Sequence, residues 1–175
     1  MRIFILFLAL ISPYVFSEES IWVIDNNKPD PERVFGFPDD MNFDNGFLIP
    51  SINMLPVKYG DYLRITLKVT EWFGVKPAQK CIGTKVGEPI DKGMGLHKFN
   101  SVWIKMDQIC TAYKREDNQD VIDYYMILFP QTYGDVIKII NVFKISNEVI
   151  YDNKYKFTAK GFNKTFDIYS KRLGL

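Results

Sequence analysis

The stretch that decides the fold class is Asp61-Tyr62-Leu63-Arg64-Ile65-Thr66-Leu67-Lys68-Val69-Thr70. Its apolar residues, from Leu63 to Val69, occupy every second position, and polar or charged residues fill the positions between them. Successive side chains of a β-strand point to opposite faces of a sheet. The pattern therefore predicts a strand with one face against a core and the other toward solvent.

Other segments carry weaker forms of the same signal, separated by Gly, Pro, Asn and Asp residues. Further strands are expected at 21–24, 34–37, 47–49, 99–109, 124–129, 135–145, 154–158 and 165–170. Helical signals are scarce, and residues 116–125 carry the one short candidate. Short strands at this spacing, with 14 Phe and 10 Tyr, are typical of a β-sandwich core. Strands at this spacing indicate a sandwich or a barrel, and we predict one all-β domain, an antiparallel β-sandwich.

One short pattern occurs twice, 74 residues apart in the chain. Tyr59-Gly60-Asp61 and Tyr133-Gly134-Asp135 each precede apolar residues that alternate with a basic one. The simplest interpretation is that two strands share the same entry turn, and it predicts two comparable strand starts.

The N-terminal residues have the layout of a secretory signal. Met1 and Arg2 give a positive start, an apolar run extends from Ile3 to Val15, and Ser17 precedes an acidic pair. The run is shorter than the roughly 20 residues needed to cross a bilayer. We expect a signal peptide at 1–17 and one secreted domain at 18–175, with no membrane insertion after signal removal. An uncleaved N-terminal anchor is the alternative.

Two modifications follow from that compartment. Cys81 and Cys110 are the two cysteines of the chain, and in an oxidising compartment they are expected to form a disulfide. A zinc site made from these cysteines and the single histidine lacks ligands. Asn163-Lys164-Thr165 is an N-glycosylation sequon, so Asn163 is a predicted glycan site.

The formal charge excludes two classes of partner. The chain has 22 basic and 21 acidic residues, and loss of Arg2 with the signal peptide makes the remainder neutral. Nucleic acids and anionic membranes select proteins with a basic excess. A glycan or an extracellular protein is the expected partner, and no nucleic acid.

Catalytic motifs are missing from the sequence. There is no nucleophile elbow, phosphate-binding loop or dinucleotide fingerprint, and any Ser-His-Asp triad would have to include His97, the single histidine. We predict a non-enzyme without a cofactor. An alternative interpretation is that His97, a lone histidine near glycine residues, is exposed and has no function.

The order of the predicted strands resembles the galectin family over residues 48–173. Leu55-Pro56 precedes the strand at 61–70, Phe129-Pro130 precedes the alternation at 135–142, and the last expected strand leads into Lys171-Arg172-Leu173. This resemblance implies a galectin-like jelly-roll that binds β-galactosides. The family's His-Phe-Asn-Pro-Arg motif has a looser counterpart in Leu96-His97-Lys98-Phe99-Asn100.

The first hypothesis for function is a galectin-like carbohydrate-binding protein. Its candidate ligand-binding residues are His97, Asn100, Trp103, Arg115 and Glu116. For Trp103 the alternative is a core position, and for Arg115 and Glu116 it is a solvated loop. The first alternative function is a secreted protein-interaction module or effector with an exposed aromatic patch. The second is an extracellular carrier of an apolar ligand in an internal cavity.

Overall fold

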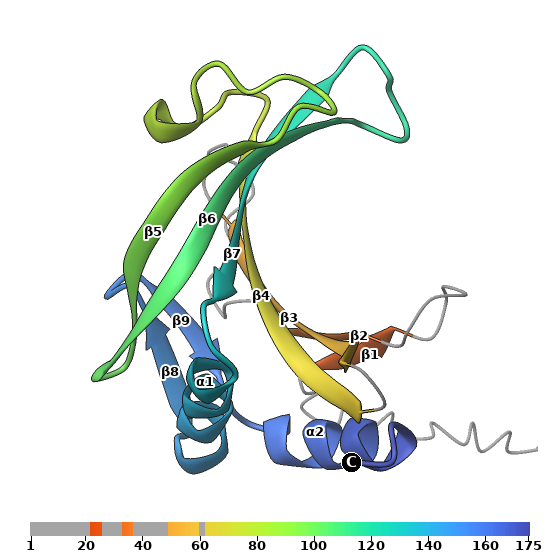
Figure 1. The fold of residues 1–175 in the computed structure, drawn as a ribbon, viewed down its shortest axis with the longest axis vertical. Helices are drawn as coiled ribbons and strands as arrows, with labels where there is room; N and C mark the ends of the chain where they lie inside the picture. Colours follow the sequence, from red (N-terminus) through yellow and green to blue (C-terminus); the bar gives the residue numbers. More distant parts are fainter. Residues whose placement is uncertain (1–21, 26–32, 37–48, 60–61) are drawn as a thin grey trace, which may run out of the picture.

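The computed structural model describes residues 22–25, 33–36, 49–59 and 62–175 (Figure 1). Its strands are β1 (Val23–Asp25), β2 (Arg33–Gly36), β3 (Ile49–Tyr59), β4 (Tyr62–Gly74), β5 (Ile90–Phe99), β6 (Val102–Lys114), β7 (Ile122–Pro130), β8 (Glu148–Tyr151) and β9 (Tyr155–Thr158). They pair in the order β1-β2-β3-β4-β7-β6-β5-β8-β9, and every pairing is antiparallel. The antiparallel β fold predicted from the sequence is confirmed. A sandwich is not, because the described strands form one sheet.

The sheet is strongly curled, and two helices lie together at one end of it (Figure 1). Helix α1 (Tyr133–Ile145) packs on β4, β6, β7 and β8, and helix α2 (Phe162–Arg172) packs on β1, β2 and α1. We call the face that packs on the helices the inner face and the opposite one the outer face. The hydrophobic core lies between the inner face and the helices.

The strand that the alternation predicted is β4. Ile65, Leu67 and Val69 are buried on its inner face, as expected from their spacing. The same parity continues to Glu71 and Phe73, which are also buried. The inner face of β4 thus carries a carboxylate within an otherwise apolar series.

Two segments predicted as strands are helices, so those predictions are wrong. In α1 the buried residues Val136, Ile139, Ile140 and Phe143 are spaced three and four apart, which is the period of one helix face. Thr132 is the N-cap: its hydroxyl oxygen accepts from the Asp135 N–H at 3.1 Å. The hydroxyl also donates to the Asp135 carboxylate at 2.7 Å.

The second of these segments, 165–170, belongs to α2. Phe162, Thr165 and Tyr169 are buried with the same helical spacing. Of the two closing strands expected at 154–158 and 165–170, the first is therefore present as β9 and the second is not a strand. The repeated Tyr-Gly-Asp pattern also fails as a pair of strand starts, because its second copy lies in the first turn of α1.

Several strand boundaries also differ from the predicted ones. The strand expected at 99–109 corresponds to β6, which begins at Val102; Phe99 is the last residue of a separate strand, β5, and the turn between the two strands contains Asn100, which has a φ of 53°. The helix candidate at 116–125 is the β6–β7 connection and the start of β7. The sequence pattern did not predict strands β3, β5 and β8; β3 includes Pro50 and Pro56, two residues typical of turns.

The predicted disulfide between Cys81 and Cys110 is present. It ties the short helical turn η2 (Gln79–Cys81) to β6, and both cysteines are fully buried. Neither α1 nor α2 has the length and hydropathy of a membrane-spanning helix, and the same is true of every helix in the described residues. The predicted signal peptide at 1–17 and the strand positions 47–48 lie outside those residues.

Candidate functional site

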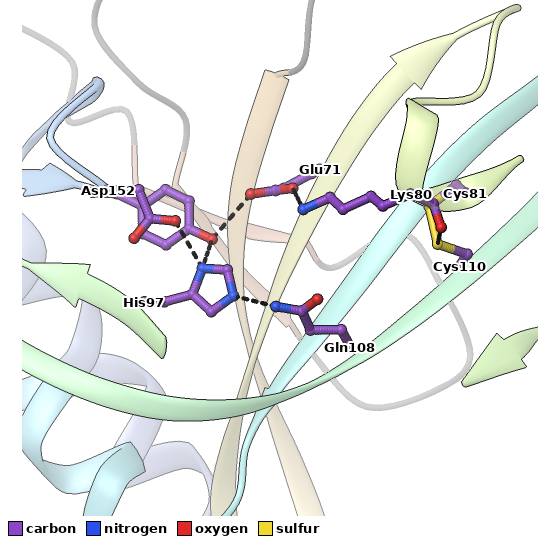
Figure 2. Close-up of polar contacts among 8 residues, drawn as sticks. Glu71, Lys80, Cys81, His97, Gln108, Cys110 and Asp152 are labelled. Carbon is purple, nitrogen blue, oxygen red and sulfur yellow. Dashed lines mark hydrogen bonds and ion pairs between the residues drawn. A yellow bond between two sulfur atoms is a disulfide. The ribbon is translucent and has the colours of Figure 1, made fainter. Parts of the chain in front are cut away.

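A network of polar side chains crosses the inner face of the sheet (Figure 2). It consists of Glu71 on β4, His97 on β5, Gln108 on β6, Tyr151 on β8 and Asp152 directly after β8. Strands β7 and β6 separate β4 from β5 in the sheet, so only its curl brings Glu71 close to His97. Glu71 and His97 are each 4% exposed and Tyr151 is fully buried.

His97 is the centre of this network. Its Nδ1 lies 2.7 Å from Asp152 Oδ2 and 2.9 Å from the Tyr151 hydroxyl oxygen. Its Nε2 lies 2.9 Å from the side-chain nitrogen of Gln108. The Tyr151 hydroxyl donates to Glu71 Oε1 at 3.0 Å. Asp152 Oδ1 accepts the backbone N–H of Lys98 at 2.7 Å, which fixes its carboxylate beside the imidazole.

These partners define one tautomer of neutral His97. Nδ1 carries the proton and donates to Asp152, while Nε2 accepts from the Gln108 amide. The tautomer and the Gln108 amide orientation are assigned together from this hydrogen-bond pattern.

Glu71 is a buried carboxylate, and burial of its charged form costs free energy unless the charge is paired or hydrogen-bonded. Burial raises the pKa of Glu71 above its ordinary value of 4.5, and the nearby Lys80 ammonium acts in the opposite direction. Lys80 Nζ lies 3.8 Å from Glu71 Oε2. Burial and the neighbouring carboxylates raise the pKa of Tyr151 far above its ordinary value, so its hydroxyl keeps the proton that it donates to Glu71.

Two local features hold this arrangement in place. The disulfide at Cys81 anchors η2 to β6, and Lys80 is the residue next to it (Figure 2). Gly95 on β5 leaves room for the Gln108 amide: a Cβ at Gly95 would overlap the amide nitrogen and come within 3.1 Å of His97 Nε2. A side chain at position 95 is therefore incompatible with the Gln108–His97 hydrogen bond.

Three residues of the network place metal-ligating atoms close to one another. One donor atom from each of Glu71, His97 and Asp152 lies within 4.8 Å of the other two. They supply one imidazole nitrogen and two carboxylate oxygens. The Asp152 side chain is 33% exposed and reaches solvent, whereas the other two side chains are buried.

A second feature lies on the outer face, at the end of the β6–β7 hairpin. It is an open hollow of about 640 Å³, which we call the tyrosine hollow. Its lining residues are Tyr113, Lys114, Arg115, Glu116, Asp117, Asp123 and Tyr125. The Tyr113 and Tyr125 rings are 5.7 Å apart at an angle of 62°, and Tyr113 is 52% exposed. Trp72 pairs with Tyr125 in the β4–β7 register, which places its indole beside the same face.

An ion pair forms part of the tyrosine hollow. Arg115 donates from Nε and Nη2 to the two oxygens of Asp123, at 2.9 and 2.7 Å. The Arg115 guanidinium holds the pKa of Asp123 below its ordinary value, and the Trp72 indole acts in the same direction. This two-point contact fixes the plane of the guanidinium next to the tyrosine rings.

Of the five predicted ligand-binding residues, the structure brings together only Arg115 and Glu116. His97 is buried in the inner network, so the interpretation that it is exposed is wrong. Asn100 forms the β5–β6 turn, where its side chain accepts the Ile150 N–H at 2.7 Å and donates to the Glu148 carbonyl. Trp103 is 57% exposed on the outer face, so it is not a core residue. Arg115 and Glu116 line the tyrosine hollow.

The predicted glycan acceptor Asn163 is exposed at the start of α2. Its side-chain nitrogen donates to the Lys144 carbonyl at 3.2 Å. Glycosylation at this position stays a prediction.

Some functional candidates were missed from the sequence although a signal existed. Glu71 follows Ile65, Leu67 and Val69 at the same parity, and a carboxylate on an apolar face is a recognisable anomaly. Gln108 interrupts the apolar face of β6 in the same way. No comparable signal marks Asp152, because it comes to His97 from 55 residues away in the chain.

Comparison with protein-family models, with curated proteins and with solved structures gives no match for this chain. The functional argument therefore depends on the geometry of these two features.

Proposed function

We propose that this chain is a secreted, non-enzymatic binding protein that holds a carbohydrate in the tyrosine hollow. The observation that carries the proposal is the pair of rings, Tyr113 and Tyr125, set around the planar Arg115–Asp123 pair in an open hollow of about 640 Å³. Small-molecule sites are typically clefts of about 300–1,000 Å³.

The chemistry of the hollow suits a sugar. A pyranose has an apolar C–H face and a rim of hydroxyl groups, so its recognition needs an aromatic surface beside fixed hydrogen-bonding groups. Tyr113 supplies exposed ring surface, and its polar neighbours Lys114, Glu116 and Asp117 can donate to or accept from hydroxyls. The Arg115 fork is already oriented by Asp123, so little side-chain entropy is lost when a ligand binds.

This proposal keeps the ligand class of the galectin resemblance but changes the residues. Arg115 and Glu116 remain, whereas His97 and Asn100 have partners within the fold and lie outside the hollow. In this proposal the rings of Tyr113 and Tyr125, and not Trp103, supply the aromatic surface that contacts the sugar.

A glycan array probed with the oxidised, purified protein tests the ligand class, and titration of the best glycan gives its Kd. Tyr113→Ala is expected to weaken binding about tenfold, since an aromatic contact of this kind contributes on the order of 1 kcal/mol. Trp103→Ala is the matched control, because Trp103 is an equally exposed aromatic residue of β6 outside the hollow. Its Kd should stay within about twofold of the wild type.

Two results would overturn the carbohydrate proposal. One is an array without any bound glycan. The other is a glycan whose Kd is the same for Tyr113→Ala and the wild type. If the hollow instead captured an extracellular protein in a Tyr113-dependent manner, the interaction-module alternative would replace it.

Secretion is tested separately. The Cys81–Cys110 disulfide supports it, since such bonds persist in oxidising compartments. A C-terminally tagged chain should accumulate in the medium of expressing cells with residues 1–17 removed. Retention in the cytosol with both thiols open to alkylation would reject this part of the proposal.

A further inference from the structure

We propose that Glu71, His97 and Asp152 form a binding site for one zinc ion on the inner face of the sheet. This site is separate from the tyrosine hollow, which lies on the outer face, and it does not depend on the proposed carbohydrate function. The sequence argument against zinc counted only cysteine and histidine ligands, whereas here the carboxylates complete the set.

The donor types select the class of metal. One imidazole nitrogen and two carboxylate oxygens are ligands that zinc accepts. Calcium and magnesium prefer sites made entirely of oxygen, so an imidazole at the centre of the cluster argues against both. Three protein ligands leave a fourth position for water, and the half-open Asp152 side provides a path for the ion.

The distances are close to those of a zinc site. Ligands at about 2.1 Å from zinc in tetrahedral geometry lie roughly 3.4 Å from one another. The three donor atoms are already within 4.8 Å, and His97 Nδ1 and Asp152 Oδ2 are 2.7 Å apart. To reach these separations the side chains must shift, and the Tyr151 hydroxyl, 3.0 Å from Glu71 Oε1 and 2.9 Å from His97 Nδ1, must move from its place between those two atoms.

The charge of the cluster favours a cation. Two carboxylates face one imidazole in a largely buried position. Lys80 reaches Glu71 Oε2 at 3.8 Å, and its side chain is 47% exposed, so this ion pair compensates the buried charge weakly. A divalent ion between Glu71 and Asp152 would supply a positive charge at a position where burial strengthens its attraction to the two carboxylates.

Zinc binding requires a defined change at His97. The ion needs the Nδ1 lone pair, so the proton must move to Nε2, which now accepts from Gln108. A rotation of the Gln108 amide by half a turn presents its carbonyl oxygen to the new Nε2–H. Gln108 would then be a positioning residue, since metal-bound histidines usually donate their other ring N–H to such a partner.

Because His97 is the only histidine, its ring can be observed without assignment ambiguity. Long-range ¹H–¹⁵N NMR of the metal-free, oxidised protein should show a protonated Nδ1 and an unprotonated Nε2. One equivalent of ZnCl₂ should move the proton to Nε2 and shift Nδ1 to a metal-bound frequency. A purely structural network would keep the metal-free pattern at every zinc concentration, and that result would overturn the proposal.

Calorimetric titration with ZnCl₂ locates the site. Asp152→Asn is expected to weaken zinc binding by at least about tenfold, while its amide oxygen can still accept the Lys98 N–H. Glu71→Gln should weaken it likewise. Asp167→Asn, which removes an exposed carboxylate of α2, is the control and should bind as the wild type does.

Three outcomes contradict the inference. Wild-type protein that takes up no zinc rejects it outright, and so does an Asp152→Asn variant with wild-type affinity. Displacement of zinc by an equal concentration of CaCl₂ or MgCl₂ would show that the imidazole is not a ligand. If Glu71→Gln fails to fold, the NMR experiment on the wild type and the Asp152→Asn titration still decide the question.

Discussion

Gly95 shows how a single residue controls the inner network. The position has no side chain, and this absence lets the Gln108 amide lie against His97. In the sequence, Gly95 belongs to a glycine-rich stretch that resembles a loop, but it is a strand residue opposite Met106. Its importance comes from the space that it leaves, which no local pattern encodes.

The first prediction concerns this contact. Gly95→Ala should destabilise the fold by about 1 kcal/mol, because the added methyl displaces the Gln108 amide and removes its hydrogen bond to His97. In a Gln108→Ala background the same substitution should cost less, since the overlapping amide is gone and only the 3.1 Å contact with His97 Nε2 remains. Urea unfolding of the four proteins measures this double-mutant cycle. Equal costs in both backgrounds would show that Gly95 acts through some other neighbour.

At the scale of single elements, α1 shows why the sequence was misinterpreted. Between Asp135 and Ile145, apolar residues are so frequent that both an alternating and a helical pattern can be drawn through them. The N-cap signal decides between the two: Thr132 and Asp135 are three residues apart, as in a capping box with a shorter acid. Gly134 lies between these two residues, and a glycine at that position favours a turn as much as a helix start.

Gly134 provides the second prediction. It lies in the first turn of α1 without a positive φ, and an added Cβ would meet Thr132 Oγ1 at an ordinary 3.6 Å. Gly134→Ala should therefore stabilise the protein by about 0.4–1 kcal/mol by reducing the entropy of the unfolded chain. Gly161→Ala is the control and should destabilise it, because Gly161 has a φ of 79°. Thermal unfolding measures both, and a destabilising Gly134→Ala would favour a turn over a helix.

The β6–β7 hairpin provides a third prediction, on pH. The pKa of Asp123 is lower in the folded protein than its unfolded value of about 3.9, because Arg115 binds the charged form. The ion pair thus stabilises the fold above that pH, and the contribution disappears as the pH falls through the folded pKa. Urea unfolding should show Asp123→Asn less stable than the wild type at pH 6.5, with a smaller difference at pH 3. A difference independent of pH would mean that the carboxylate charge is irrelevant.

For the whole molecule, the disulfide and the curl of the sheet act together. The bond between Cys81 and Cys110 joins positions 29 residues apart and fixes η2 against β6 near the inner network. The helices close the other end of the curled sheet, where Trp22 donates from its indole N–H to the Thr158 carbonyl. The polar network lies on the inner face between these two closures.

The fourth prediction removes the cross-link. The double variant Cys81→Ala/Cys110→Ala should lose about 3–4 kcal/mol, the loop-closure entropy of a loop of this length. For a domain of this size the loss corresponds to a decrease in Tm of roughly 10 °C. Wild-type protein treated with reductant should unfold at nearly the same temperature as the double variant. An unchanged Tm in both samples would show that the bond adds no stability.

The sequence alone determined the features that depend on near neighbours in the chain. The alternation of apolar and polar residues identified β4, because successive side chains of a strand point to opposite faces. The presence of two cysteines in the chain predicted the disulfide between Cys81 and Cys110. The sequence did not decide whether α1 is a helix or a strand, because its apolar residues are so frequent that they fit both the helical period and the strand period. The two candidate sites were decided only by tertiary structure. Glu71, His97 and Asp152 converge because the sheet curls, and Tyr113 meets Tyr125 because of the β6–β7 register. Such contacts join residues far apart in the chain, and they depend on how strands pair and bend rather than on local sequence pattern.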